Sequence, residues 1–160
     1  MRRFGKTRVT AHLIPAGARR SFALARILVV DDDAAVQMTV RLLLERAGHS
    51  VVTADNGRKG LALCRTGDFD LLFLDIEMPG MSGLDLIKKL GNTKPLIIFT
   101  TAKKDYAVEA FELNVVDYLI KPIALPRFKQ AVEKASETIE SNKQELKVEE
   151  QGFVFVKDNG

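Results

Sequence analysis

The chain alternates short apolar runs with segments of helical spacing. The apolar runs are RILVV (26–30), SVVTA (50–54), DLLFLD (70–75), PLIIFTT (95–101) and VVDYLI (115–120). Apolar residues three or four positions apart predict helices between them, over about residues 34–47, 57–65, 84–90 and 106–113. A last, longer helix is predicted from about Leu125 into Ser141.

This alternation predicts the fold class. Strands that are buried on both faces have continuous runs of Val, Ile and Leu, and such strands occur in parallel sheets covered by helices. Right-handed crossovers then place helices on both faces of the sheet. The sequence therefore predicts a doubly wound α/β domain with a five-stranded parallel sheet.

Polar residues end four of the five apolar runs. They are Asp31-Asp32-Asp33, Asp75, Thr100-Thr101 and Lys121-Pro122. Each has an ordinary structural explanation when taken alone, because Asp caps helices, Thr suits strands and Lys-Pro forms turns. Since sites in open parallel sheets form outside the carboxyl ends of the strands, we expect these residues to converge on one site.

Converging carboxylates need a cation. Each pair of charges repels by roughly 4 kcal/mol at about 4 Å and an effective dielectric of about 20. Ligands that are all oxygens, without His or Cys, favour Mg²⁺, with Mn²⁺ as a substitute, over zinc. Lys121 adds a fixed positive charge, and Asp75 is the candidate nucleophile for phosphoryl transfer.

Composition indicates one domain in a reducing compartment. The chain has 160 residues, of which 46% are hydrophobic, so it is long enough for one domain with tails. A single cysteine, Cys64, rules out an intrachain disulfide, and no apolar run approaches a membrane span. We expect a cytoplasmic protein with no membrane partner.

The positive charge is confined to the start of the chain. Residues 1–24 contain six cations and no acid, so a net charge of +3 for the whole chain leaves −3 for the remainder. We expect residues 1–24 to be a basic, disordered extension, with an organellar transit peptide or an RNA-binding arm as the alternatives. The mildly acidic body is not expected to bind nucleic acid by itself.

The basic residues also change type along the chain. Residues 1–86 contain 10 Arg and 2 Lys, whereas residues 87–160 contain 1 Arg and 11 Lys. One hypothesis is that the chain is a recombinant of two homologous domains joined near Leu84 to Lys88. Chance and local selection are the alternative.

Four motifs resemble the receiver domain of two-component response regulators. They are ILVVDDD (27–33), LLFLDIEMPGMSG (71–83), FTTA (99–102) and DYLIKP (117–122). The resemblance spans about residues 26–140, and the order and spacing of the motifs make it specific. It implies a flavodoxin-like strand order, 2-1-3-4-5, with a receiver domain over residues 25–140.

The resemblance also implies roles for individual residues. Asp75 would accept a phosphoryl group from a histidine kinase, and the chain would be a signalling domain rather than an enzyme with an external substrate. The Mg²⁺ ligands would be Asp31, Asp32, Asp75 and the backbone carbonyl of Glu77. The residues that bind the phosphoryl group or switch with it would be Thr101, Ala102, Lys121 and Tyr118, and the Lys121-Pro122 peptide bond would be cis.

Three further expectations concern neighbours of this site. Asp33 is expected to cap the helix that begins at Ala34, and Thr100 is expected to be a bystander. Glu77 and Lys103 flank the site and could form a partial lid.

The later half resembles the LytR/AlgR regulators, whose effector is a LytTR DNA-binding domain. FVFVKDNG (153–160) is similar to the first strand of such a domain. Residues 141–160 would then be a linker and the truncated start of an effector. Phosphorylation would switch the face of the fourth helix, fifth strand and fifth helix, over about residues 106–113, 115–120 and 125–135. This face would control homodimerisation and transcription, with DNA bound only through the missing effector.

Other functions fit the residues less well. A haloacid-dehalogenase-type phosphatase also uses an Asp nucleophile and Mg²⁺, and Asp31 with Asp33 fits its acid pair. Its motif needs Thr or Val where this chain has Ala35, and it needs longer insertions. A flavin-binding domain would need a hydroxyl-rich phosphate loop, and an inert packing domain would show no Mg²⁺ dependence.

Overall fold

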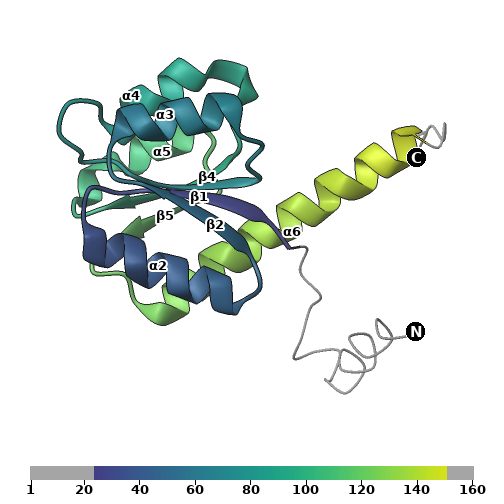
Figure 1. Ribbon diagram of the computed structural model, residues 1–160, viewed down its shortest axis with the longest axis horizontal. Helices are drawn as coiled ribbons and strands as arrows, with labels where there is room; N and C mark the ends of the chain where they lie inside the picture. The colour runs from purple at the N-terminus through teal and green to yellow at the C-terminus, as the bar shows by residue number, and fades with distance from the viewer. Residues whose placement is uncertain (1–23, 151–160) are drawn as a thin grey trace.

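The computed structural model describes residues 24–150 as an alternation of strands and helices (Figure 1). The strands are β1 (Arg26–Val30), β2 (Ser50–Ala54), β3 (Leu71–Asp75), β4 (Leu96–Thr101) and β5 (Asp117–Ile120). The helices are α2 (Ala34–Arg46), α3 (Gly57–Thr66), α4 (Gly83–Leu90), α5 (Ala107–Glu112) and α6 (Leu125–Glu150), with short 3-10 turns at Gly91–Thr93 and Lys104–Tyr106.

The five strands form one parallel sheet in the order β2-β1-β3-β4-β5. This confirms the predicted fold class and strand order. The register places Asp75, at the end of β3, beside Thr100 of β4. The strands β1 and β3 are adjacent although a helix, a strand and a second helix separate them in sequence, so their carboxyl ends lie next to each other.

Helices cover both faces of the sheet (Figure 1). On one face, α2 and α6 bury one set of strand side chains, and Phe73 stacks on Phe128 with ring centroids 5.5 Å apart. On the other face, α3, α4 and α5 cover the alternate side chains, among them Leu72, Leu74 and Phe99. Every residue of β3 is buried, which explains the apolar run Leu71–Leu74 that precedes Asp75.

The last helix is longer than the sequence predicted. We expected α6 to give way to a linker near Ser141, but it continues to Glu150 and projects away from the sheet (Figure 1). Residues 141–146 are exposed. They include Lys, Gln, Glu and Leu, which all have high helix propensity, so this segment can remain helical without packing on the body.

Two of the expectations fall outside the described residues. The basic extension lies there except for Leu24, as does the predicted effector strand at 153–160. Among residues 24–150, no helix has the length and apolarity that crossing a membrane requires.

Candidate functional site

Four strand ends place their polar residues at one edge of the sheet. Asp31 follows β1, Asp75 ends β3, Thr101 ends β4 and Lys121 follows β5. The first three side chains are almost fully buried, with 2%, 2% and 0% of their surface exposed. Each is therefore fixed by the strand that carries it, while its polar atoms lie where the strands stop.

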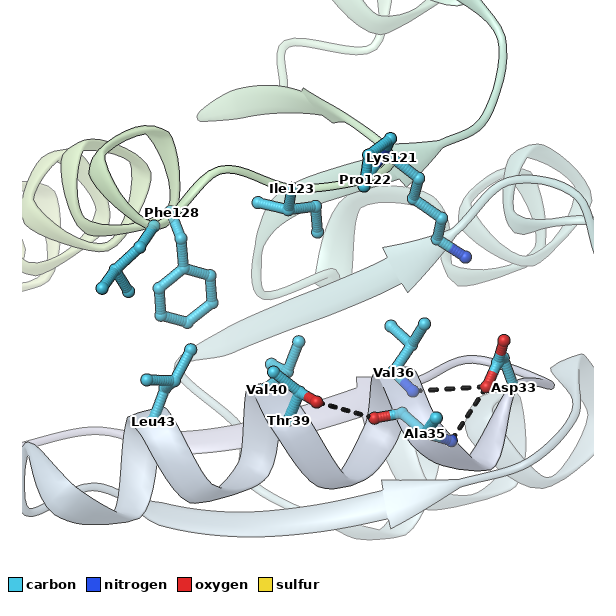
Figure 2. Close-up of a pocket in the computed structure, with 11 residues that line it drawn as sticks. Asp33, Ala35, Val36, Thr39, Val40, Leu43, Lys121, Pro122, Ile123 and Phe128 are labelled. Atoms are coloured by element: carbon cyan, nitrogen blue, oxygen red, sulfur yellow. Dashed lines mark hydrogen bonds between the residues drawn. The ribbon is translucent and has the colours of Figure 1, made fainter.

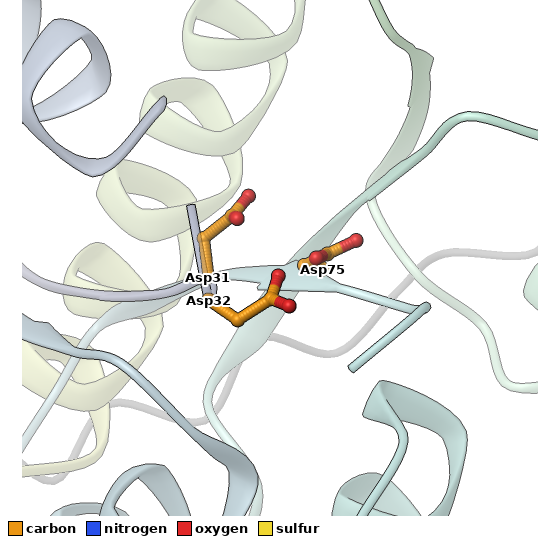
Figure 3. A group of neighbouring side chains, drawn as sticks. All are labelled: Asp31, Asp32 and Asp75. Atoms are coloured by element: carbon orange, nitrogen blue, oxygen red, sulfur yellow. The ribbon is translucent and has the colours of Figure 1, made fainter. Parts of the chain in front are cut away.

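The carboxylates of Asp31, Asp32 and Asp75 form a cluster. One oxygen from each lies within 4.8 Å of the others (Figure 3). Lys121 reaches into this cluster from β5, with its Nζ 3.0 Å from Asp31 Oδ2 and 3.4 Å from Asp75 Oδ1. The structure thus brings together the acids and the lysine that the sequence placed at separate strand ends.

The cluster has more negative charge than Lys121 can neutralise. Burial and the nearby charge of Asp31 raise the pKa of Asp75 to about 7, although Lys121 acts in the opposite direction. Burial lowers the pKa of Lys121, but the hydrogen bond to Asp31 and the charges of Asp31 and Asp75 outweigh it, so this pKa is raised. Lys121 therefore stays protonated, and the site needs further positive charge to keep Asp75 ionised.

The cluster fits a hard divalent cation. Its available ligand atoms are carboxylate oxygens, the type that Mg²⁺ prefers. Asp31 and Asp75 are buried while Asp32 is exposed, so the group is open to solvent on one side. An ion held here would keep room for water or a phosphate oxygen, as Mg²⁺ sites of proteins commonly do.

The three aspartates after β1 have two different roles. Asp33 Oδ1 accepts from the backbone N–H groups of Ala35 and Val36 at 2.8 and 3.3 Å, so it caps α2 as predicted. Asp31 Oδ1 accepts from the Asp33 N–H at 2.9 Å, which orients the Asp31 carboxylate toward the cluster. The cap and the cluster therefore use different members of one triplet.

Beside the cluster, the carboxylate of Glu77 occupies the donors expected to bind phosphate. The Thr101 hydroxyl donates to both Glu77 oxygens, at 2.7 and 2.8 Å, and the Ala102 N–H donates to one of them at 2.8 Å. The sequence had suggested only a backbone ligand and a partial lid at Glu77. Its position two residues after Asp75 was the only signal for a closer role.

Tyr118 and Lys103 are joined through the backbone. The Tyr118 hydroxyl donates to the Lys103 carbonyl at 2.7 Å, and the Lys103 N–H donates to Thr101 Oγ at 3.0 Å. A single residue, Lys103, therefore connects the expected switch residue Tyr118 to the Thr101 hydroxyl that is expected to bind phosphate. The Lys121-Pro122 peptide bond is cis.

The loop after β3 is held against the strand by Gly83. The Gly83 N–H donates to the carbonyl of Ile76 at 3.0 Å, and a Cβ at this position would lie 2.5 Å from the carbonyl oxygen of Asp75. Ser82 and Asp85 form a reciprocal capping box at the start of α4. Only glycine lets α4 begin this close to the phosphoacceptor candidate.

Sequence reasoning missed an ion pair behind Lys121. Arg127 on α6 donates two hydrogen bonds to the Asp117 carboxylate, at 2.8 and 3.1 Å, and one to the Tyr118 carbonyl at 3.1 Å. Burial raises the pKa of Asp117, but the hydrogen bonds from Arg127 and the Tyr118 N–H, together with the charges of Arg127 and Lys134, outweigh it, so the pKa is lowered. This contact fixes α6 to β5, the strand that leads to Lys121.

An apolar groove of about 650 Å³ adjoins the cluster. Figure 2 shows Val36, Val40 and Leu43 of α2 on one side, with Ile123 and Phe128 facing them from the segment after β5. Asp33 and Lys121 lie at the end of the groove nearest the carboxylates. A partner that filled this groove would lie beside the site.

Comparison with known families agrees with this geometry. The chain matches the family described as "Response regulator receiver domain" over residues 27–133. The chain belongs to the response regulator receiver family. The match favours a receiver over the phosphatase alternative, in which Asp31 rather than Asp75 would be the nucleophile.

Individual relatives of this receiver are LytR-type regulators. The chain is 38% identical to the sensory transduction protein LytR of Staphylococcus saprophyticus over 118 residues, which cover 71% of the chain and 46% of the relative. It is 34% identical to the sensory transduction protein LytT of Oceanobacillus iheyensis over 123 residues, covering 73% and 50%. The chain thus spans about half the length of the curated relatives it matches, and the match supports the expected LytR-like character.

Solved structures show the same receiver fold. The response regulator TrrA from Thermotoga maritima, crystallised in complex with Mg²⁺-BeF, is 33% identical with a TM-score of 0.64, over 70% of this chain and 99% of that one. The REC domain of AraT from Geobacillus stearothermophilus is 31% identical with a TM-score of 0.69, over 76% and 99%.

Proposed function

We propose that the chain accepts a phosphoryl group on Asp75 from the phosphohistidine of a sensor histidine kinase. The observation that supports this most is the convergence of Asp75, two further carboxylates and Lys121 at one edge of the sheet. An aspartate next to a metal site and a fixed ammonium group has the components that phosphoryl transfer requires.

The transfer exchanges one bond to phosphorus for another. A carboxylate oxygen of Asp75 forms a bond to phosphorus while the phosphorus–nitrogen bond of phosphohistidine breaks. The imidazole nitrogen keeps the electron pair and takes up a proton. When the signal ends, water attacks phosphorus and the bond between phosphorus and the Asp75 oxygen breaks. Inorganic phosphate leaves and the Asp75 carboxylate is restored. The chain acts as acceptor and assists its own dephosphorylation.

Asp31, Asp32, Asp75 and the backbone carbonyl of Glu77 would hold Mg²⁺, or Mn²⁺ in its place. The bound ion supplies positive charge that offsets the phosphoryl oxygens. Lys121 would pair with one phosphoryl oxygen, since its Nζ already lies between Asp31 and Asp75. The Thr101 hydroxyl and the Ala102 N–H would donate to another.

Phosphorylation would shift an existing equilibrium on the face formed by α5, β5 and α6. When Thr101 turns toward the phosphoryl group, its bond to the Lys103 N–H changes, and the Tyr118 hydroxyl is bonded to the same residue. This face exposes Val108 and Phe111 of α5, at 66% and 87%, together with Ile120 and Leu125. Exposed apolar side chains of this kind support homodimerisation.

The kinase and the effector complete the proposed role. The groove between α2 and the segment after β5 would receive the phosphohistidine-bearing helix of the kinase, because it leads to Lys121. Residues 25–140 would be the receiver, and residues 141–160 would lead to an effector that binds DNA and controls transcription. A cytoplasmic location accords with the single cysteine.

The test is intact-mass measurement after incubation with acetyl phosphate, with and without Mg²⁺. The wild type should gain one phosphoryl group only with Mg²⁺, and Asp75→Asn should gain none. An adduct on Asp75→Asn, or an adduct that forms equally without a divalent cation, would count against the proposal. Catalytic release of phosphate from phosphomonoesters, lost in Asp31→Asn and kept in Asp75→Asn, would support the phosphatase alternative.

A further inference from the structure

Glu77 places a carboxylate where the phosphoryl oxygens are expected to bind. The single hydroxyl proton of Thr101 is shared between its two oxygens, at 2.7 and 2.8 Å, and the Ala102 N–H donates to one of them at 2.8 Å. Thr101 is completely buried, so its hydroxyl has few alternatives when it is bonded to Glu77. The unphosphorylated site therefore already contains an anion on these donors.

That anion belongs to the same short segment as Asp75. The Glu77 N–H donates to Asp75 Oδ1 at 3.3 Å, so the backbone of Glu77 faces the acceptor while its side chain turns to β4. The charge of Glu77 also contributes to the raised pKa of Asp75, after burial, the charge of Asp31 and the hydrogen bond with Asp32. Glu77 thus adds negative charge to a site that has an excess of it.

We propose that the Glu77 side chain is an internal competitor of the phosphoryl group, which must release Thr101 and Ala102 before they can bind phosphoryl oxygens. This inference rests on the proposed function and adds a positioning residue to it. Hydrogen bonds to a charged acceptor are among the stronger ones in proteins, so their release slows phosphorylation. It also sets the resting position of the switch, because Lys103 bonds to Thr101 Oγ and to Tyr118.

Three variants separate competition from charge. Glu77→Ala removes the carboxylate, whereas Glu77→Asp keeps the charge on a side chain one methylene shorter, which withdraws it from the two donors. Both keep the backbone carbonyl proposed as a metal ligand. Glu145→Ala is the matched control, since it removes the same charge from an exposed position of α6.

The readout is the rate of adduct formation with acetyl phosphate and saturating Mg²⁺, followed by intact mass. We expect about a tenfold increase for both Glu77 variants, which corresponds to losing one charged hydrogen bond, and no change for Glu145→Ala. In the unphosphorylated, metal-free protein, the Ala102 amide resonance should move in both Glu77 variants and stay in place in Glu145→Ala. Thermal unfolding verifies that the variants fold.

Several results would overturn the inference. A wild-type rate in both Glu77 variants would show that release of Glu77 does not limit phosphorylation. A faster Glu77→Ala with an unchanged Glu77→Asp would assign the effect to charge repulsion alone. An unchanged Ala102 amide resonance would mean that the hydrogen bond is absent in solution. Failure of every chain, the wild type included, to form an adduct would instead refute the proposed function, and this inference would fall with it.

Discussion

At the scale of single residues, Asp75 is both buried and close to other negatively charged side chains. Its strand is apolar on both faces, so the backbone has no freedom to move the carboxylate into solvent. Burial and Asp31 raise its pKa to about 7, which makes its ionisation unfavourable without a cation. The strain at Asp75 is therefore electrostatic, and Mg²⁺ would relieve it.

This shift predicts how stability depends on pH in the absence of metal. Because the pKa of Asp75 is raised in the folded state, its stabilising contribution is complete below about pH 4 and is lost as the pH rises through 7. Asp75→Asn removes the charge, so we expect its free energy of unfolding at pH 8 to exceed that of the wild type by up to about 4 kcal/mol, because the pKa rises from 3.8 to about 7 and one pKa unit is about 1.4 kcal/mol. Urea unfolding in EDTA between pH 4 and 8 measures this.

The control is the same series with saturating Mg²⁺. Binding to the folded state should stabilise the wild type more than Asp75→Asn, so the difference should shrink or reverse. Equal stability of the two proteins at every pH in EDTA would show that Asp75 is not under electrostatic strain.

At the scale of elements, the start of α4 fixes the end of β3. A Cβ at Gly83 would meet the Asp75 carbonyl, which is backbone and cannot move aside cheaply. We expect Gly83→Ala to lower the free energy of unfolding by about 1–3 kcal/mol, as overpacking does. Phosphorylation by acetyl phosphate should also slow, because the acceptor strand must shift.

Gly80→Asn is the matched control for this change. Gly80 has a positive φ of 81° and open space around its Cβ position, and Asn tolerates positive φ better than most residues. Its stability and rate of phosphorylation should stay close to those of the wild type. A Gly83→Ala variant that behaves like Gly80→Asn would contradict the close packing of α4 on β3.

A substitution in the groove beside α2 tests docking of the kinase separately from the phosphorylation reaction itself. Thr39 lies on the wall of the groove and is exposed, and its hydroxyl donates to the Ala35 carbonyl within the same helix. In Thr39→Arg the larger side chain would fill the groove and prevent the kinase from docking there. We expect phosphotransfer from a histidine kinase to slow by about tenfold or more, the size of effect that losing an important interface contact has. The substitution should leave the reaction with acetyl phosphate unchanged. If phosphorylation by both donors slowed equally, the substitution would have damaged the site itself. If phosphotransfer from the kinase did not slow, the groove would not be the docking site.

Sequence patterns predicted these elements because burial dictates their composition. A strand such as β3, covered on both faces, needs an apolar run up to its last residue, and parallel strands carry their carboxyl ends at one edge, so the sequence already predicted that Asp31, Asp75 and Lys121 lie together. The direction in which Glu77 turns could not be predicted, since a loop side chain can bond to several neighbours. The Asp117–Arg127 pair was missed for a similar reason, because it joins a strand and a helix whose angle is set by packing.

At the scale of the whole molecule, the body ends well before the last helix does. The side chains of 141–146 are exposed, so the polar composition that suggested a linker describes a helix that has left the sheet. The predicted helix end near Ser141 is the point where the helix stops being buried against the sheet. The helix continues beyond it because the residues that follow have high helix propensity. This exposed part of α6 would transmit a movement of the buried part of the helix to a point distant from the receiver.

The exposed apolar face predicts phosphorylation-dependent dimers. Phe111 is 87% exposed on α5, so it contributes little to the stability of the monomer. The phosphorylated wild type should sediment as a dimer, and Phe111→Glu should remain monomeric with an unfolding free energy within about 0.5 kcal/mol of the wild type. Analytical ultracentrifugation with and without phosphorylation measures this. Dimers of the phosphorylated variant that match the wild type would place the interface elsewhere.

Among the three clustered aspartates, Asp75 is the one proposed to accept the phosphoryl group, and chemical trapping of the acyl phosphate tests this directly. After reaction with acetyl phosphate and Mg²⁺, borohydride reduces an acyl phosphate of aspartate to homoserine, and peptide sequencing by mass spectrometry locates it. We expect homoserine at position 75 alone, and none when Mg²⁺ is omitted. Homoserine at position 31 or 32, or at position 75 without any divalent cation, would contradict it.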